Sequence, residues 1–183
     1  GARSVLVVDN CCCRHAHAPW QPESDDFPRW GADVGFVGTY EAPRADDLMA
    51  LAKAGIKVRV WGNGWQTLHG VHANLIIEGR PVYGDDYRRV VATSALNLCF
   101  LRKGNRDLQT CRSMELPAMG AAMLHEASGE VEKLFAPECE ALYFSDSHEL
   151  VAVAKRWLAD PDGLRRLGAA ARLAGGGLDD HHA

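Results

Sequence analysis

Short apolar runs alternate along this chain with stretches in which apolar residues recur every three or four positions. The runs lie at 34–38, 57–61, 96–101, 121–124 and 141–144, and each has the length of a β-strand. The run at 96–101 suits a strand that is covered on both faces, whereas 57–61 alternates. The stretches between them have the spacing of amphipathic helices. Because strand and helix alternate about five times, the pattern predicts an α/β fold with a doubly wound, Rossmann-like parallel sheet.

Local signals place several helix ends. Pro43 suits a first helical turn and Gly55 a stop, which predicts a helix between them. Asp85 or Asp86 can cap the helix that carries Tyr87. The run at 75–77 is open to two interpretations, a short strand or a core anchor in a loop.

The last two helices carry clearer start signals. Asp146 and Glu149 form a pattern that resembles a capping box, and Asp160 with Pro161 combines a cap and a first-turn proline. The final helix carries three leucines. These are Leu164, Leu167 and Leu173.

The chain divides into three parts by composition. Residues 4–9 have the pattern of a strand, and 11–30 are rich in Pro, His and acidic residues without a sustained period. We interpret 1–30 as the remnant of an upstream domain and a linker, 31–174 as one Rossmann-like domain, and 175–183 as a flexible tail.

A cluster of charge separates the strand at 96–101 from a helix expected at 108–119. It contains Arg102, Lys103, Arg106 and Asp107. In open α/β sheets, ligands bind where a strand ends and a helix begins. An anion over this loop would meet basic side chains and free N–H groups of the helix start, so the sequence indicates a nucleotide diphosphate site.

Arg112 and Glu115 lie three residues apart on the expected helix, with Asp107 two turns before Glu115 on the same side. Glu115 could accept hydrogen bonds from ribose hydroxyls. The alternative is a solvated ion pair that contributes a few tenths of a kcal/mol. Pro117 either kinks this helix or ends it before Met119.

Composition limits the functional classes. The chain has 183 residues and a formal net charge of −4, so it can bury a core and carries no sign of a nucleic-acid or membrane surface. No apolar run approaches the ~20 residues of a membrane-spanning helix, and we expect a cytoplasmic location.

The six cysteines include the run at 11–13, which is followed by His15 and His17. Adjacent residues on an extended chain point to opposite sides, so this run would need a special turn to hold a metal ion. A metal or redox role therefore stays the weaker interpretation. Cys99, Cys111 and Cys139 are expected to be buried thiols.

Several blocks of the sequence resemble one enzyme family, the CgeB-like, group 1 glycosyltransferases. The blocks lie at 96–107, 111–124 and 131–135, with Glu-Leu-Val-Ala and Leu-Ala-Asp-Pro near the end. The similarity covers 31–173, and Arg-Ser-Met-Glu-Leu-Pro-Ala-Met-Gly, which ends at residue 120, is its most specific part. The resemblance implies the carboxyl-terminal, sugar-nucleotide-binding half of a GT-B enzyme, which works without a metal in its active site.

The resemblance also implies roles for particular residues. Glu115 matches the glutamate that binds the donor ribose hydroxyls. Asp107 stands where the other acid of a Glu-x7-Glu pattern would be, one methylene shorter. Arg102 and Lys103 correspond to the basic groups on the diphosphate. Gly38 and Thr39 correspond to the first phosphate-side loop, and Val82 and Tyr83 are placed at the nucleobase.

Catalysis would then depend on fixed cations. When a nucleoside diphosphate departs, negative charge grows on the β-phosphate, and Arg102 and Lys103 are the natural groups to stabilise it. His125 and Glu126 lie at the same edge and could touch the sugar, although a satisfied histidine at a strand end is the commoner case. The expected ligand is a UDP- or GDP-type sugar, with no other cofactor. The acceptor site would lie on an N-terminal GT-B domain that 183 residues cannot also contain.

Three functional hypotheses remain open from the sequence. The first is the donor-binding domain of a sugar-nucleotide-dependent glycosyltransferase. The second is a non-catalytic nucleotide-binding or scaffold domain that shares the fold. NAD-dependent chemistry is disfavoured, because the glycines at 35, 38, 62 and 64 do not complete a dinucleotide-binding signature.

Overall fold

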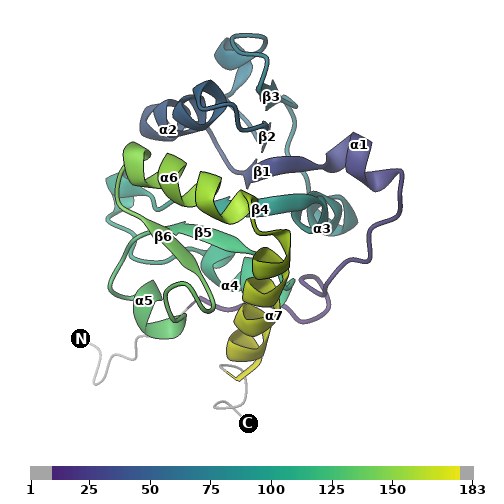
Figure 1. Cartoon of the computed structure of the whole chain (residues 1–183), viewed down its shortest axis with the longest axis vertical. Helices are drawn as coiled ribbons and strands as arrows, with labels where there is room; N and C mark the ends of the chain where they lie inside the picture. Colours follow the sequence, from purple (N-terminus) through teal and green to yellow (C-terminus); the bar gives the residue numbers. More distant parts are fainter. Residues whose placement is uncertain (1–9, 178–183) are drawn as a thin grey trace, which may run out of the picture.

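The computed structural model describes residues 10–177 and forms one six-stranded sheet (Figure 1). The strand order is β3-β2-β1-β4-β5-β6, and every neighbouring pair is parallel. This confirms the predicted doubly wound α/β sheet. The strands are β1 (Ala32–Val37), β2 (Val58–Trp61), β3 (Leu75–Ile77), β4 (Ser94–Cys99), β5 (Met123–Glu126) and β6 (Leu142–Phe144).

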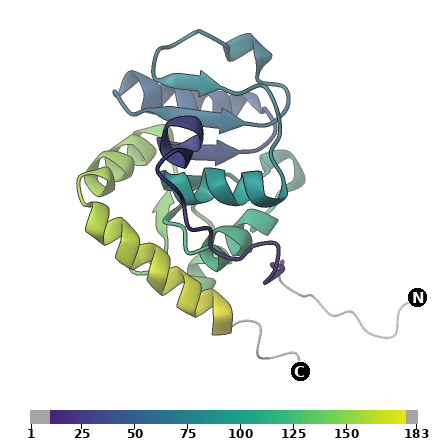
Figure 2. The ribbon, with the colours of Figure 1, turned by 90° about the vertical axis from the view of Figure 1, so that its right-hand side faces the viewer.

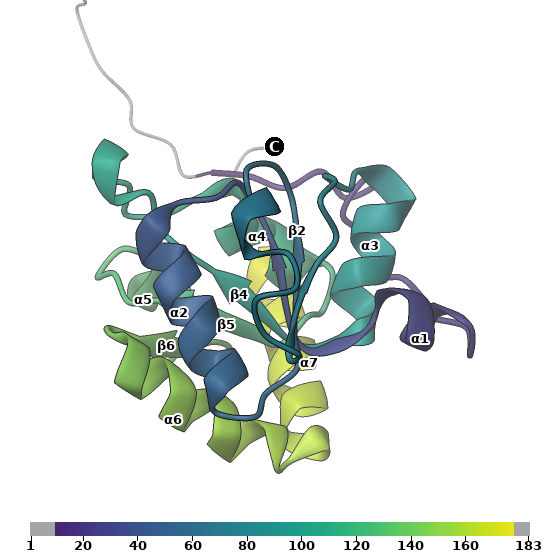
Figure 3. The same ribbon diagram turned by 90° about the horizontal axis from the view of Figure 1, so that it is seen from above.

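Helices cover both faces of the sheet, as Figure 3 shows from above. The α-helices are α1 (Asp26–Trp30), α2 (Ala42–Lys53), α3 (Gly84–Thr93), α4 (Cys111–Ala118), α5 (Val131–Leu134), α6 (Ser147–Leu158) and α7 (Pro161–Gly177). Two 3-10 turns, η1 (Gln66–Leu68) and η2 (Lys103–Asn105), lie in loops.

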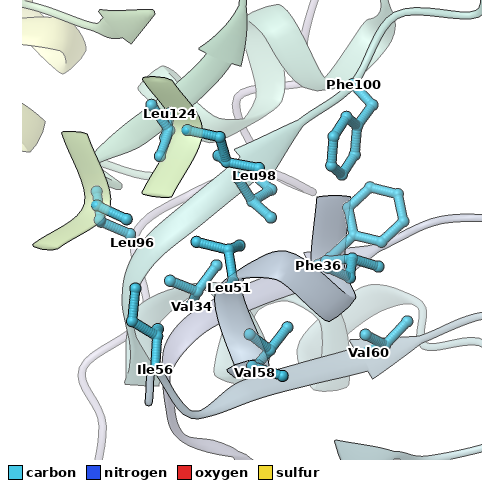
Figure 4. Packing of buried hydrophobic residues seen from close by; sticks show 14 of the residues in the cluster. Val34, Phe36, Leu51, Ile56, Val58, Val60, Leu96, Leu98, Phe100 and Leu124 are labelled. Carbon is cyan, nitrogen blue, oxygen red and sulfur yellow. The ribbon is translucent and has the colours of Figure 1, made fainter. Parts of the chain in front are cut away.

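The core consists of two hydrophobic clusters, one on each face of the sheet. On one face, α2 and α6 pack on alternate residues of the strands, and Figure 4 shows Leu51 of α2 among Val34, Val58 and Leu98. On the other face, residues of α3, α4 and α5 join strand residues such as Trp61 and Met123 in the second cluster. The apolar runs of the sequence therefore mark strands that are buried on both sides.

Several predicted helix ends are confirmed. Pro43 lies in the first turn of α2, and Gly55 follows this helix with φ 88°. Asp146 Oδ1 accepts from Glu149 N at 2.8 Å, and Asp160 Oδ1 accepts from Gly163 N at 2.8 Å. These caps satisfy amide groups that have no partner within their own helices.

The central strand-loop-helix unit is shifted from its prediction. β4 begins two residues earlier than expected and ends at Cys99, and α4 begins at Cys111 rather than at residue 108. Asp107 therefore lies in the loop, so the prediction that it shares a helix side with Glu115 is wrong. Ser113 fixes the new start, because its Oγ accepts from Thr110 N at 2.9 Å. Pro117 lies in the last turn, and α4 ends at Ala118.

The predicted caps of α3 are also wrong. Tyr83 is the N-cap, and Asp85 and Asp86 lie in the first turn. Their carboxylates instead pair with Arg88 at 3.0 Å and with Arg89 at 2.9 Å, one turn along the helix. Arginines three residues ahead compete for acids that would otherwise turn back to the backbone.

Other corrections concern burial. Of the three leucines of the last helix, Leu164 and Leu167 are buried, whereas Leu173 is 81% exposed. Cys99 is buried as predicted, but Cys111 and Cys139 are exposed. The sequence 75–77, which was open to two interpretations, is the edge strand β3. β5 is shifted by two residues, so His125 and Glu126 belong to the strand.

The segment before the sheet is packed against the domain rather than running as an irregular linker. It contains α1, and Trp30 stacks on Trp61 with ring centroids 5.2 Å apart. Figure 2 shows this purple segment on the outside of the domain below α1. The strand predicted at 4–9 and the end of the predicted tail lie outside the described residues, and α7 continues through Gly177.

Within residues 10–177, no helix has both the length and the apolar character needed to cross a membrane.

Candidate functional site: a cationic cavity at the switch point of the sheet

A cavity of about 490 Å³ opens at the carboxyl ends of β1, β2 and β4. The chain builds the sheet outward from β1 in one direction and then from β4 in the other, so the cavity lies at the topological switch point, where open α/β sheets bind ligands. Its lining consists of Asn10, Phe36, Val37, Gly38, Thr39, Arg44, Gly62, Asn63, Pro81, Val82, Tyr83, Phe100, Arg102, Asp107, Gln109, Thr110, Cys111 and Arg112.

Two glycines bring backbone into the cavity wall. Gly62 has φ 141°, and a Cβ there would lie 2.0 Å from the carbonyl oxygen of Gly38. That oxygen also accepts a hydrogen bond from Trp65 Nε1 at 2.8 Å. Because no side chain fits between the two loops, a ligand can approach their backbone directly.

Arg44 is a buried cation in this wall that the sequence interpretation missed. It is 8% exposed, and its Nη1 and Nη2 donate to the carbonyl oxygens of Thr39 at 3.1 Å and Leu101 at 3.2 Å. Its Nε has no hydrogen-bond partner among the described residues. Burial, chiefly, lowers the pKa of Arg44, but an arginine stays charged at neutral pH. Its position in the first turn of α2, directly after the carboxyl end of β1, could have marked it as a candidate, because ligands of open α/β sheets bind at that edge.

Two further arginines line the same cavity. Arg112 extends from the first turn of α4, and its Nε is likewise buried without a hydrogen-bond partner in the described part of the chain. Arg102 is more exposed and pairs with Glu41, whose Oε1 lies 3.2 Å from its Nε. Arg44 pairs with the same carboxylate at 3.3 Å. Three guanidinium groups therefore border a cavity that also contains the Asp107 carboxylate.

Lys103 lies outside the cavity lining. Its Nζ is 3.1 Å from Glu126 Oε1, and the lysine side chain is 68% exposed against 13% for the glutamate. Glu126 Oε2 also accepts from Leu101 N at 2.9 Å. Lys103 and Glu126 thus form a pair beside the cavity, tied to the loop that Arg44 also holds.

His125 is fully buried beneath the start of α4. Its Nδ1 is 2.5 Å from the carbonyl oxygen of Glu126, and its Nε2 is 2.8 Å from Ser113 Oγ. A carbonyl can only accept, so Nδ1 carries a proton and, in the neutral ring, Ser113 donates to Nε2. His125 is therefore hydrogen-bonded within the protein and does not face the cavity.

Cys99 belongs to the same buried network, with its Sγ 3.5 Å from Thr110 Oγ1. Burial opposes ionisation of this thiol most strongly, yet its pKa is lowered overall because His125 and hydrogen bonds from Thr110 and Ser113 stabilise the thiolate. Burial likewise opposes charge on His125, whose pKa is raised overall by Cys99 and the Glu126 carbonyl. The network fixes the first turn of α4, which carries Arg112.

Glu115 lies one helical turn beyond the cavity lining. Its Oε2 accepts from Tyr87 OH at 2.9 Å, and its Oε1 is 3.6 Å from His17 Nε2. Arg112 and Glu115 lie three residues apart on α4, but Arg112 lines the cavity, whereas Glu115 contacts Tyr87 and His17.

The structure brings together seven of the residues that the sequence selected. These are Gly38, Thr39, Val82, Tyr83, Arg102, Asp107 and Arg112. It places Lys103, Glu115, His125 and Glu126 outside the cavity lining. Besides Arg44, the sequence interpretation missed Thr110, which no pattern marked.

Within the described part of the chain, no group of three or more histidine, cysteine or acidic side chains is arranged to hold a metal ion.

Comparison with solved structures identifies the class of fold. Sucrose-phosphate synthase from Thermosynechococcus elongatus matches with a TM-score of 0.70 and 17% identity over 92% of this chain and 47% of that chain. The C-terminal domain of a group 1 glycosyl transferase (LpcC) from Francisella tularensis matches with a TM-score of 0.68 and 8% identity over 90% and 96%. The fold is thus that of the carboxyl-terminal domain of GT-B glycosyltransferases.

Sequence comparison then gives the family. The model of the glycosyl transferase-like family matches residues 44–175, so the chain belongs to that family. Anabaena HepE, solved in complex with UDP-glucose, is a further structural neighbour, with a TM-score of 0.69 and 13% identity over 94% of this chain and 52% of that chain. The chain spans about half the length of sucrose-phosphate synthase and HepE. A comparison with curated protein sequences gave no match.

Proposed function

We propose that this chain is the donor-binding half of a GT-B glycosyltransferase, which transfers a sugar from a UDP- or GDP-type sugar nucleotide to an acceptor. The cavity at the switch point of the sheet, bordered by Arg44, Arg102 and Arg112, carries this proposal. Buried guanidinium groups bind phosphate oxygens well, because their planar forks match that geometry.

In the proposed reaction, the bond between the anomeric carbon and the β-phosphate oxygen breaks. Its electron pair leaves with the nucleoside diphosphate, while the oxygen of an acceptor hydroxyl bonds to the anomeric carbon and its proton is released to the solvent. Arg44, Arg102 and Arg112 stabilise the negative charge that grows on the diphosphate. Lys103 adds positive charge beside the cavity. On this proposal the cationic side chains carry out charge stabilisation without a metal ion.

The other ligand contacts follow the loops around the cavity. The glycine-lined wall at Gly38 and Thr39 would approach the phosphates, and Val82 and Tyr83 the nucleobase. Glu115 would accept hydrogen bonds from the ribose hydroxyls, with Asp107 nearer the phosphates. His125 would act through the protein, since it holds Ser113, and Glu126 through its pairing with Lys103.

The acceptor would bind to a second, N-terminal GT-B domain. The half-length matches to sucrose-phosphate synthase and HepE support this part of the proposal. We also propose membership of the CgeB-like subgroup, from the block that ends at Gly120, and a cytoplasmic location. Sequencing the coding region upstream of Gly1 tests the proposal of an N-terminal GT-B domain, since a second α/β domain is expected there.

Calorimetry tests the donor site. UDP, UDP-glucose and GDP are titrated into the protein, expressed together with its upstream coding sequence and confirmed as folded by circular dichroism. At least one nucleotide is expected to bind, and Glu115→Ala should weaken binding. Arg156, exposed on α6 and paired with Glu138, supplies the control variant Arg156→Ala. Absence of binding heat from the folded protein would remove the proposal.

A non-catalytic nucleotide-binding or scaffold domain is the second candidate. Lys103 lies outside the cavity lining and is paired with Glu126, which also fits a domain that binds nucleotide without catalysing transfer. The full-length protein would then bind nucleotide while releasing no free sugar and forming no glycoside from a radiolabelled donor.

A further inference from the structure

The Glu115 carboxylate is held from two sides by residues of different segments. Tyr87 OH, from α3, donates to Oε2 at 2.9 Å, and His17 Nε2, from the segment before the sheet, lies 3.6 Å from Oε1. Tyr87 and Glu115 are 28 positions apart in the chain, and His17 is farther still. Neither contact follows from the local spacing of α4.

Both neighbours of Glu115 present a proton to its carboxylate. His17 Nδ1 accepts from Cys13 N at 3.0 Å, so in the neutral ring the proton sits on Nε2 and points at Glu115. Burial, chiefly, raises the pKa of Tyr87 well above its usual value, and the nearby Glu115 carboxylate raises it further. The phenol therefore keeps its proton and remains a donor.

The segment that carries His17 is anchored independently of Glu115. Arg88 donates from Nε to the Ala18 carbonyl at 2.8 Å and from Nη2 to the Pro19 carbonyl at 3.1 Å. The Arg89 guanidinium lies 4.5 Å from the centroid of the Trp20 ring. α3 thus supplies Tyr87 and also anchors the segment that carries His17.

Each of the three segments also reaches the cationic cavity. Asn10, Tyr83 and Cys111 line it, and Tyr87 and Glu115 follow the last two by four residues, one helical turn. Long side chains on a helix point back towards its N-terminus, which is the direction of the cavity. An ionised carboxylate has about four lone-pair sites, and Tyr87 occupies one of them, so sites remain for a ligand.

We propose that Tyr87 and His17 are positioning residues that fix the Glu115 carboxylate for the ribose hydroxyls of the donor nucleotide. The inference rests on the proposed function. A carboxylate fixed from two sides keeps its remaining lone pairs in one direction, and the ordering of its side chain is completed before the nucleotide binds. The segment at 10–20 is therefore part of the donor site rather than only a connection to it.

Matched variants and matched ligands test this inference by calorimetry. Tyr87→Phe removes only the hydroxyl, and His17→Ala removes the imidazole. The controls are Tyr143→Phe, whose hydroxyl donates to the Val131 and Phe135 carbonyls away from the cavity, and His15→Ala on the same segment. Each is titrated with UDP, with its 2′,3′-dideoxy analogue and with pyrophosphate, or with the guanosine equivalents if only GDP gives heat.

We expect Tyr87→Phe to weaken UDP binding roughly tenfold, as the loss of a hydrogen bond to a charged group implies, and His17→Ala several-fold. Binding of the dideoxy analogue and of pyrophosphate should stay unchanged, and both controls should match the wild type. Unchanged UDP affinity in Tyr87→Phe and His17→Ala overturns the inference, and so does an equal loss for UDP and pyrophosphate, which marks a general structural defect. A wild-type protein that binds neither UDP nor GDP overturns the proposed function itself.

Discussion

Arg44 Nη2 lies 3.2 Å from the carbonyl oxygen of Leu101, across 57 positions of the chain. This contact joins the helix that follows β1 to the loop that follows β4, the two strands between which the sheet changes direction. Arg44 thereby shapes the cavity as well as adding charge to it. A residue with both roles should affect stability and ligand binding together.

We therefore predict that Arg44→Lys lowers both the free energy of unfolding and the affinity for UDP. A lysine keeps the charge but lacks the planar fork whose Nη1 and Nη2 reach the Thr39 and Leu101 carbonyls separately. A buried carbonyl left without a donor costs about 1–3 kcal/mol. Urea unfolding and calorimetry measure the two effects, with Arg156→Lys as the control. Wild-type values for both quantities would contradict the role given to Arg44.

A second prediction concerns Lys103 and Glu126. Lys103→Ala should weaken nucleotide binding because it removes a cation and also leaves the mostly buried Glu126 carboxylate without its partner beside an anion site. Adding Glu126→Gln to Lys103→Ala should restore part of the lost affinity. A double variant no better than Lys103→Ala would show that Glu126 does not act on the ligand. Calorimetry with UDP on the single and double variants gives this coupling.

Asp47 provides a prediction of pH dependence. Burial, chiefly, raises its pKa, although Ser147 Oγ donates to Oδ1 and stabilises the charge. A raised carboxyl pKa means that the folded state binds the proton more tightly than the unfolded state, so the ionised group costs stability at neutral pH.

Asp47→Asn should thus raise the urea midpoint at pH 7, and the gain should shrink as the pH falls towards about 3.9, the ordinary pKa of aspartate. Asp46→Asn, at the exposed neighbouring position, is the control. A gain that is independent of pH would exclude ionisation of Asp47 as the cause.

Trp30 tests whether the segment before the sheet belongs to the folded domain. It is 2% exposed and stacks on Trp61, with the Arg80 guanidinium 5.4 Å and 5.0 Å from the two ring centroids. Trp30→Ala should lower the free energy of unfolding by about 3–5 kcal/mol. Leu173→Ala, at an exposed position, should change it by less than about 0.5 kcal/mol. Equal effects in urea unfolding would mean that this segment is not docked.

The sequence predicted the sheet well because its strands are buried on both faces and so appear as continuous apolar runs. The sequence predicted helix ends less accurately, because these depend on which of several possible hydrogen-bond partners a polar side chain has. The start of α4 depends on a bond between Thr110 N and Ser113 Oγ, and Ser113 is fixed in turn by His125. His125 belongs to β5, 12 positions beyond Ser113, so the start of α4 could not be located from the spacing of apolar residues alone.

The candidate site divides in the same way. The edge of the sheet, the loop glycines and the basic loop after β4 could be selected from the sequence, because a parallel sheet collects the ends of its strands at one edge. Arg44 was missed, since an arginine in a first helical turn is ordinary until its partners are known. Lys103 was selected for its charge, and the structure pairs that charge with Glu126.

The order of apolar and polar positions by itself determined an α/β chain, its parallel strands and the edge of the sheet at which the cavity lies, because hydrophobic burial follows a short-range period. Only the tertiary structure decided which charges meet. Arg44 reaches Leu101, and Glu115 is held by Tyr87 and His17, because side-chain pairing depends on distances between segments that are far apart along the chain. Those pairings turn a common fold into a particular arrangement of cations and a carboxylate.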